Sequence, residues 1–402
     1  MTSPKKSQSR FERQKVRILD AATLLLNERG VGGMTFLDVA DALDLTATSI
    51  TYYFRYKEQL AAAVFEDTLR RLEEMAREAG TAPTPYERVD RYVALHFQAH
   101  ADALRGNARP LAILSEIRTL EESVRRPLIE HYQRIFRLVR ELFVDADSMN
   151  DRGELTARAQ LLNEALFWSV TWLGRYAISE FDGVRTRLLA ILENGLASPA
   201  ASRPSTPLAL DEAWEEVRGD AALLRVATRL INDIGYRGAS VDRIAAELNL
   251  TKGTLYHYRD GKDDLVLACF HDSYRRLKHL QEAAEVTSAG SRGEGLWIAI
   301  AAALGLQFDG SYPLLRSTAL QALPSTVRDV ALGLSDRTAL RLTGALVDGM
   351  AEGTLRIADP LIGSHLILST INSAYDIRNW SNRIGGAIAV KTITALLMFG
   401  IF

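Results

Sequence analysis

The sequence has very little cysteine, no long apolar run and almost no net charge. Its 402 residues include one cysteine, Cys269, which excludes a disulfide framework and predicts a small core residue in a reducing compartment. No run of 18 or more apolar residues occurs, so no membrane-spanning helix is predicted, and the apolar segment 385–402 is expected to be a buried C-terminal helix. The first 17 residues are polar and basic, unlike a signal peptide. These features predict a cytoplasmic protein without a membrane partner.

Signatures of catalysis and of cofactor binding are also missing. No GxSxG, P-loop, HExxH or CxxC motif occurs, so neither an enzyme nor a cofactor is predicted. His96 and His100 have the i, i+4 spacing of metal ligands, but a third ligand is not evident and no metal site is predicted. The net charge of −2 disfavours a general polyanion binder but allows a local basic patch that binds DNA.

The chain does contain a repeat with a period of 205 residues. Residues 18–65 align with residues 223–270 without a gap, and the same offset aligns Gly195 with Gly400 near the end of each copy. A whole unit has therefore been duplicated, not only a motif. Identical pairs include Ala22/Ala227, Thr23/Thr228, Gly30/Gly235, Gly33/Gly238, Ala40/Ala245, Leu43/Leu248, Thr46/Thr251, Tyr53/Tyr258 and Lys57/Lys262.

Each copy begins with the pattern of a helix-turn-helix. In the first copy, an apolar stripe predicts a helix that ends at Gly30, a residue suited to the left-handed turn after a helix. Thr35 and Asp38 form the sequence pattern of a capping box, which opens a short second helix. Thr46 is expected to cap a third helix over residues 48–54, whose small and hydroxyl side chains allow it to enter the major groove.

The two strings ILDAATLLLNERG…VADALDLTATSITYYFRYKEQL and LLRVATRLINDIGYRGASVDRIAAELNLTKGTLYHYRDGKDDL resemble the N-terminal DNA-binding domain of the TetR/AcrR family of bacterial transcriptional regulators. In copy one, the resemblance implies base and phosphate contacts from Thr46, Thr48, Ser49, Thr51, Tyr52, Tyr53 and Lys57. In copy two, it implies contacts from Thr251, Lys252, Gly253, Thr254, Tyr256, His257, Tyr258 and Lys262.

The two copies depart from the family pattern in different places. Thr51 stands where the family usually has tyrosine, and the turn that begins at Arg259 lacks the usual phenylalanine. Residues 1–60 carry nine basic and seven acidic residues, whereas residues 211–270 carry eight and eleven. Because phosphate attraction supplies much of the affinity for DNA, copy one is expected to bind DNA more strongly than copy two.

The fold class predicted is all-α, because apolar residues recur at three- and four-residue spacing almost throughout. Residues 1–14 are expected to be a polar arm that cannot fold alone. The charged pairs Arg70–Arg71 and Arg275–Arg276 are expected on solvated faces of the fourth helix of each copy. The predicted divisions are 1–60 and 211–265 for two helix-turn-helix domains, 61–197 and 266–402 for two helical ligand-binding and dimerisation domains, and 198–210 for a linker rich in proline and serine.

Two groups in the helical domains have both a functional and a structural interpretation. Tyr92, His96 and His100 are candidates for the few polar groups of an effector pocket, or are satisfied histidines near a core. An aromatic stripe of Trp168, Trp172 and Tyr176 is either ordinary core or, as the family resemblance implies, part of a four-helix dimer interface.

The family resemblance implies a ligand-responsive regulator, a repressor more often than an activator, that binds an operator in double-stranded DNA at the nucleoid of a bacterium. Helix-turn-helix proteins of this kind place two recognition helices about 34 Å apart, so a chain with two copies predicts a covalent pseudo-dimer joined through residues 155–197 and 359–402. Its unlike recognition helices predict an asymmetric operator. Three alternatives stay open: a protein-interaction scaffold, a regulator in which only copy one binds DNA and whole chains form a homodimer, and a helical enzyme with regulatory heads. The effector, the operator and the sign of regulation are not predicted.

Overall fold

The computed structural model describes residues 4–145, 151–199, 201, 221–249 and 261–402, with the backbone alone for residues 4–10, 321–322 and 325–326. The described residues form helices and one isolated β-bridge, between Ala197 and Leu355. The fold is all-α, as predicted. None of the described helices is both long enough and apolar enough to cross a membrane.

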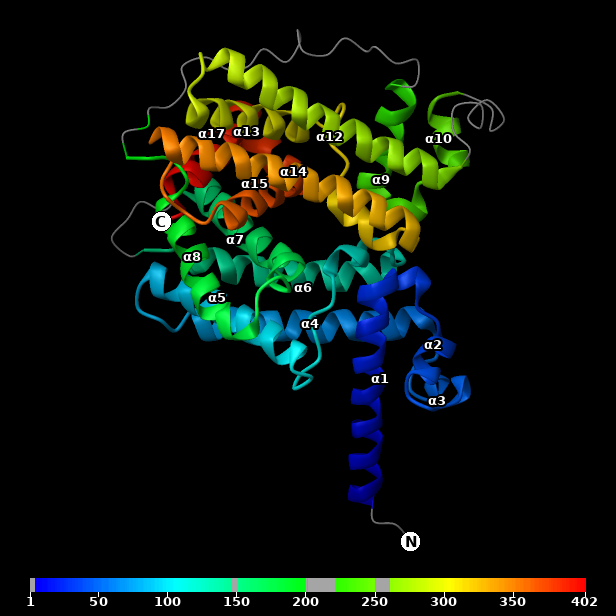
Figure 1. Cartoon of the computed structure of the whole chain (residues 1–402). Coiled ribbons are helices and arrows are strands. Elements are labelled where there is room, and N and C mark those ends of the chain that lie inside the picture. Colours follow the sequence, from blue (N-terminus) through cyan, green and yellow to red (C-terminus); the bar gives the residue numbers. More distant parts are fainter. Residues whose placement is uncertain (1–3, 146–150, 200, 202–220, 250–260) are drawn as a thin grey trace.

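The two copies have the same order of long helices (Figure 1). Copy one contains α1 (Pro4–Gly33), α2 (Phe36–Asp41), α3 (Ala47–Thr51), α4 (Lys57–Ala79), α5 (Pro85–Leu104), η1 (Leu114–Thr119), α6 (Glu122–Glu141), α7 (Arg152–Leu173), η2 (Ile178–Glu180) and α8 (Phe181–Asn194). Copy two contains α9 (Ala221–Gly238), α10 (Val241–Glu247), α12 (Lys262–Thr287), α13 (Arg292–Asp309), η3 (Ser317–Ala322), α14 (Ser325–Glu352), α15 (Pro360–Ala374), η4 (Tyr375–Ile377), α16 (Arg378–Ile384) and α17 (Gly386–Phe399).

The N-terminal arm is part of a helix. Of residues 1–14, expected to be too polar to fold alone, the described part from residue 4 onward forms the first turns of α1, which is continuous up to a kink at Gly30. In Figure 1 this part of α1 projects away from the body of the molecule. The helix-turn-helix domain at the start of each copy is called its head below. The first head supplies the apolar contacts that the arm lacks, because Ile18 and Ala22 farther along α1 are fully buried.

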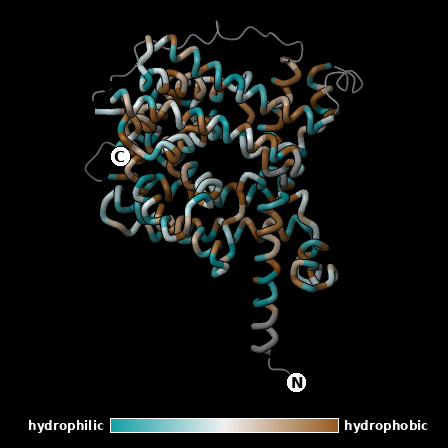
Figure 2. Tube along the Cα trace, in the orientation of Figure 1, coloured by the Kyte–Doolittle hydropathy of each residue, from teal (hydrophilic) through white to brown (hydrophobic). Residues whose placement is uncertain are grey.

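Helices α7 and α8 of copy one pack directly against α15 and α17 of copy two. These are equivalent elements, since adding 205 to the bounds of α8 gives those of α17. A single apolar core crosses the seam and contains Leu162 and Leu189 of copy one with Ile367 and Leu397 of copy two. Figure 2 shows hydrophobic residues gathered where the helices of the two copies meet.

Two hydrogen bonds at this seam are reciprocal. The amide of Ile401 donates to the carbonyl of Leu192 at 2.7 Å, and the amide of Leu196 donates to the carbonyl of Leu397 at 3.2 Å. At the offset of 205, Leu196 corresponds to Ile401 and Leu192 to Leu397, so each copy gives the other the same bond. The segment that follows α8 thus crosses the segment that follows α17.

Two equivalent glycines make this crossing possible. Gly195 has φ +68° and Gly400 has φ +100°, in the region that favours glycine. A Cβ at Gly195 would lie 2.3 Å from the backbone of Met398, and one at Gly400 would lie 2.0 Å from the carbonyl oxygen of Glu193. The two backbones approach each other too closely for any side chain at either position.

Candidate nucleic-acid interface

The head of copy one is built from caps that the sequence predicts. The amide of Asp38 donates to the Thr35 hydroxyl at 3.1 Å, and the Asp38 carboxylate accepts from the Thr35 amide at 3.0 Å, which confirms the capping box. The Thr46 hydroxyl caps α3 by accepting from the Ser49 amide at 3.3 Å. Regular helix ends at Thr51, earlier than the predicted residue 54, and the chain then passes through a turn to Phe54.

The turn between the second and third helices has the same conformation in both copies. Asp44 has φ +54°, and its equivalent in copy two, Asn249, also has φ +54°. Aspartate and asparagine tolerate this left-handed conformation better than other side chains. The predicted contact residues from Thr251 to Tyr258 lie outside the described residues.

Helix α3 presents one polar face and buries the other. Ile50 of α3 and Phe54 after it are buried and fix α3 on the head, so Thr48 and Thr51 are left on its exposed face. Among the predicted DNA contacts of copy one, Ser49, Tyr53 and Lys57 are half-buried, and four are exposed: Thr46, Thr48, Thr51 and Tyr52. Short hydroxyl side chains beside an exposed tyrosine suit close approach to base edges and phosphates.

In each head, the lysine predicted to contact phosphate also donates a hydrogen bond within the head itself. The Lys57 ammonium donates to the carbonyl of Gly32 at 3.4 Å, and Lys262 donates to the equivalent carbonyl of Arg237 at 3.3 Å. Lys262 also lies 4.3 Å from the ring centre of Tyr236, and burial lowers its pKa. Each ammonium therefore fastens the start of a long helix to the end of the first helix of its head.

Phe11 is a residue at this interface that the sequence interpretation missed. Its ring stacks on Tyr53 with 4.7 Å between centres and meets Tyr52 edge-on at 6.0 Å. The available signal was its spacing, because Phe11 continues the apolar stripe of Ile18 and Ala22 at i, i+7 and i+11. The arm thus lies beside the residues that follow α3.

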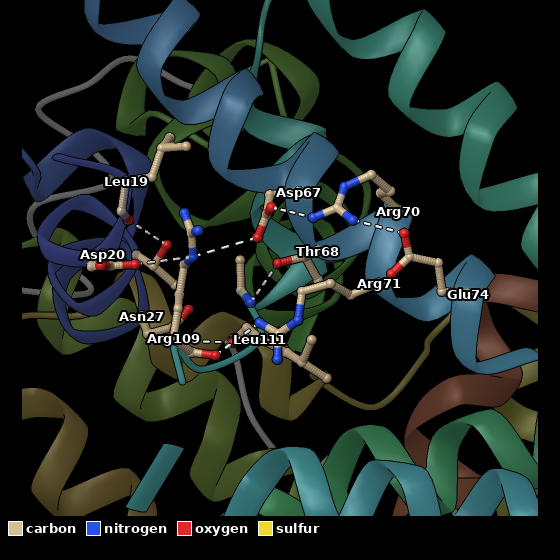
Figure 3. A network of polar contacts seen from close by, with 12 residues as sticks. Leu19, Asp20, Asn27, Asp67, Thr68, Arg70, Arg71, Glu74, Arg109 and Leu111 are labelled. Atoms are coloured by element: carbon tan, nitrogen blue, oxygen red, sulfur yellow. Dashed lines mark hydrogen bonds and ion pairs between the residues drawn. The ribbon is translucent and has the colours of Figure 1, made fainter. Parts of the chain in front are cut away.

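A network of polar contacts joins the first head to its long fourth helix (Figure 3). Asn27 of α1 donates to the carbonyl of Leu111 at 2.9 Å and accepts from the amide of Ile113 at 2.9 Å. Thr68 of α4 accepts from the amide of Ala112 at 2.9 Å. The segment after α5 is therefore held between α1 and α4, and we call these contacts the latch.

Charged residues complete the latch on one side. Arg109 Nε lies 3.2 Å from Asp20 of α1 and 3.4 Å from Asp67 of α4 (Figure 3). Arg71 donates to the carbonyl of Arg109 at 2.8 Å. Arg109 therefore links α4 to α1.

Copy two repeats the latch with different charged groups. Asn232 donates to the carbonyl of Leu314 at 3.0 Å, and Ser273 accepts from the amide of Leu315 at 2.8 Å. Tyr312 replaces Arg109 and donates to Asp272 at 2.7 Å. The side-chain bonds to the backbone of this segment are common to the two copies, whereas the ion pairs of Arg109 are not.

The prediction of solvated arginine pairs on the fourth helices is wrong for the second arginine of each pair. Arg276 is 2% exposed and donates to the carbonyl of Tyr312 at 2.6 Å. Arg71 is half-buried and makes the equivalent bond in copy one. A guanidinium binds a carbonyl of the latch in both copies, and only the flanking charges remain in solvent.

The heads touch each other and the opposite copy. Helix α1 packs against η3 of copy two, and α9 packs against η1 of copy one. Arg328 of α14 donates to the carbonyl of Glu28 at 3.0 Å. A Cβ at Gly32 would lie 1.9 Å from Nη1 of Arg237, so equivalent positions of the two heads meet. The separation of the heads is thus set by direct contact.

The three predicted pocket residues lie together inside copy one. Tyr92 is buried, and its ring meets His96 edge-on at 4.6 Å. The Nε2 atoms of His96 and His100 are buried without a hydrogen-bond partner among the described residues. Burial, with a smaller contribution from Arg71, lowers the pKa of His96 to about 4, and burial also lowers that of His100. Both imidazoles are therefore neutral at pH 7.

The aromatic stripe on α7 divides between the seam and the interior. Trp172 is buried and stacks on His365 of copy two, with 6.0 Å between ring centres. Trp168 donates to the half-buried Glu164 at 3.2 Å inside copy one, and Tyr176 is half-buried beneath the guanidinium of Arg187, 5.8 Å from its ring centre. Trp172 therefore contacts copy two.

Comparison with known proteins agrees with this description of the heads. The family described as bacterial regulatory proteins, tetR family, matches residues 18–64 and 223–269. The HTH-type transcriptional regulator BetI of Rhizobium meliloti (strain 1021) is 32% identical over 119 residues, which are 29% of this chain and 58% of that protein, so the match spans less than two thirds of that relative.

Solved structures also match about one copy of the chain. The structure of apo AibR is 23% identical and covers 45% of this chain and 99% of that chain, with a TM-score of 0.37. The structure of FadR from Bacillus subtilis in complex with stearoyl-CoA is 19% identical and covers 43% of this chain and 96% of that chain, with a TM-score of 0.32. Since the two matches to the tetR family begin 205 residues apart and coincide with the two heads, the chain consists of two tandem TetR-like units, each with a helix-turn-helix DNA-binding domain.

Proposed function

We propose that this protein is an effector-responsive transcriptional repressor that binds one operator as a covalent pseudo-dimer. The observation that carries the proposal is the seam, where α7 and α8 pack against their equivalents α15 and α17. The reciprocal bonds between Ile401 and Leu192 and between Leu196 and Leu397 support an arrangement close to a twofold axis. One chain then presents two heads without a second subunit.

Contact between the heads supports a defined spacing on DNA. The approach of Arg237 to Gly32 and the bond from Arg328 to Glu28 connect the first head to copy two. A rigid pair of recognition elements loses less orientational freedom on binding than two heads on a flexible linker would lose. The unlike sequences of residues 46–54 and 251–259 then favour an operator with unlike half-sites.

An effector site in copy one accounts for the buried polar groups near α5. Besides Tyr92 and the two histidines, whose Nε2 atoms have no hydrogen-bond partner among the described residues, Tyr132 and Glu164 belong to this interior. Burial, followed by the Glu164 carboxyl, raises the pKa of Tyr132, and burial, followed by Asp376, raises the pKa of Glu164 to about 8. An apolar interior with a few unsatisfied polar groups is the ordinary composition of a small-molecule site.

Copy two lacks this composition. From Gly295 to Leu306, the α13 segment contains apolar residues and glycine alone, and Ser369 stands at the position equivalent to Glu164. The effector therefore binds copy one. It changes operator affinity through the latch, because the segment that follows α5 is bonded to both α1 and α4.

The experiment is a selection of bound fragments from a random DNA duplex library by the intact chain. The expected consensus has two unlike half-sites at constant spacing. A Thr48→Ala/Tyr52→Ala variant should relax the sequence preference in one half-site and leave the other intact. A perfect palindrome, or a single half-site that is unaffected by the variant, would show that the chain does not act as a pseudo-dimer.

A further inference from the structure

We propose that the first turns of α1 form a basic arm that binds the DNA phosphates flanking the half-site of copy one, and that the acidic sequence of the equivalent segment in copy two does not bind them. This inference rests on the proposed operator binding and adds a second contact surface beside α3. Its occupant is double-stranded DNA, because the arm lies beside α3 and its predicted DNA contacts. The evidence is the length of α1, the contact made by Phe11 and the charge pattern.

The arm is a rigid extension of the head. Helix α1 begins at Pro4, which is 14 residues before Ile18, where the repeat starts. At a rise of 1.5 Å per residue, these 14 residues span about 21 Å. Figure 1 shows this part of α1 extending past α2 and α3. The arm therefore reaches beyond the recognition helix instead of folding back on the body.

Phe11 fixes the arm to the recognition region. Its ring stacks on Tyr53 and meets Tyr52, both predicted DNA contacts. Tyr52 and Tyr53 also meet edge-on, with 5.3 Å between ring centres. Three aromatic rings in mutual contact resist rotation of the arm about its axis. A surface on α1 thus keeps a constant orientation relative to α3.

That surface is basic on one side. Arg13 and Arg17 are exposed, and their spacing of four residues places them on one face of α1. In the sequence, Lys6 and Arg10 precede them at spacings that continue the same face. Phe11 lies about 130° around the helix from this stripe, by the 100° turn per residue. The face turned toward the head and the basic face are therefore distinct.

The equivalent segment of copy two has the opposite charge. Residues 4–17 contain six basic and one acidic residue, whereas residues 209–222 contain one basic and five acidic residues. At the offset of 205, Phe11 corresponds to Glu216 and Arg10 to Glu215. This comparison is of sequence alone, because residues 202–220 are not described. The equivalent segments of the two copies thus carry opposite charges, and only the segment of copy one is basic.

An arm at one end predicts an asymmetric footprint. A length of about 21 Å corresponds to about six base pairs at 3.4 Å each. Protection should therefore extend outward from the copy-one half-site by up to that length and stop sooner beyond the copy-two half-site. The arm contributes affinity through phosphates and carries no base preference of its own.

The test compares the salt dependence of binding to a 40-base-pair duplex of arbitrary sequence. In a Lys6→Gln/Arg10→Gln/Arg13→Gln/Arg17→Gln variant, the slope of log K against log salt should fall by about 0.9 for each lost phosphate contact, or about 3 to 4 in all. Glutamine keeps the helix propensity of the arm. The control replaces four exposed arginines of the body, Arg126, Arg134, Arg137 and Arg341, by glutamine and should leave the slope within one unit of wild type.

The test distinguishes failure of the arm proposal from failure of the proposed function. If the unaltered chain does not bind the duplex, the proposed function itself fails. If it binds, but the arm variant and the body variant change the slope equally, the arm proposal fails and the proposed function stands.

Phe11 gives an independent readout. Phe11→Ala leaves every charge in place but removes the stacking on Tyr53, so the footprint flank beside copy one should lose protection. Phe11→Tyr should restore that protection. A flank that remains protected in Phe11→Ala would overturn the positioning role, and equal protection of both flanks by the unaltered chain would overturn the proposal of a single arm.

Discussion

Substitution of Gly195 by alanine should loosen the seam between the two copies. Gly195 has φ +68° and ψ −170°, a conformation that is essentially restricted to glycine and costs other residues about 1–3 kcal/mol. The new Cβ would also lie 2.3 Å from the backbone of Met398, which cannot move as a flexible side chain would. The crossing segments must therefore separate.

Separation puts three hydrogen bonds at risk. Leu196 donates to Leu397, Ala197 to Met398, and Ile401 to Leu192, over distances of 2.7 to 3.2 Å. At about 1 kcal/mol each, loss of two or three of these bonds adds about 2–3 kcal/mol to the backbone strain. We expect Gly195→Ala to lower the free energy of unfolding by about 3–6 kcal/mol. Gly400→Ala, at the equivalent position, should act similarly.

Gly106→Ala is the matched control. Gly106 has φ +74°, but a Cβ there would meet nothing within 4 Å, so only backbone strain of about 1–2 kcal/mol is expected. Urea unfolding followed by circular dichroism measures the three variants, and gel-shift titration measures their affinity for the selected operator. Equal destabilisation by Gly195→Ala and Gly106→Ala would refute the close approach, because strain alone would then explain both.

Three further predictions concern the head, the latch and the interior. Thr46→Ala removes the cap of α3 and should destabilise the first head by about 1 kcal/mol in thermal unfolding; no change would contradict the cap. Asn27→Ala leaves the Leu111 carbonyl and the Ile113 amide unpaired and should cost about 2–4 kcal/mol, with Asn232→Ala similar in copy two; a loss below about 0.5 kcal/mol in chemical denaturation would contradict the latch. Glu164 has a pKa raised by burial to about 8, above its unfolded value of about 4.3, so the folded chain keeps a proton that the unfolded chain has released. Stability from this group therefore falls as pH rises from about 4.3 to about 8, and Glu164→Gln should gain stability relative to wild type between pH 5 and pH 8; parallel pH profiles of unfolding for the two proteins would contradict this placement of Glu164.

Local chemistry explains what the sequence predicted well. The Thr35–Asp38 capping box and the Thr46 cap involve residues three apart, and the repeat makes the second copy a check on the first. The buried state of Cys269 and the C-terminal helix α17 follow from apolar composition in the same way. Such features depend on neighbours in the sequence and need no knowledge of tertiary contacts.

Contacts between distant residues could not be predicted in this way. Asn27 bonds to residues 84 and 86 positions away, and an asparagine at the end of a helix gives no indication of that partner. The family pattern predicted a phosphate contact for Lys57, whereas its hydrogen bond to the Gly32 carbonyl depends on how α4 packs against α1. The burial of Arg276 likewise depends on the carbonyl of Tyr312, which periodicity does not reveal.

The number of chains bound to one operator duplex tests the central claim most directly. Native mass spectrometry of the intact protein with a selected operator should give a complex of one chain and one duplex, because both heads belong to the same polypeptide and the bodies behind them meet across the α7–α8 and α15–α17 seam. A complex that requires two chains for each duplex would contradict the claim, because each chain would then supply only one working head.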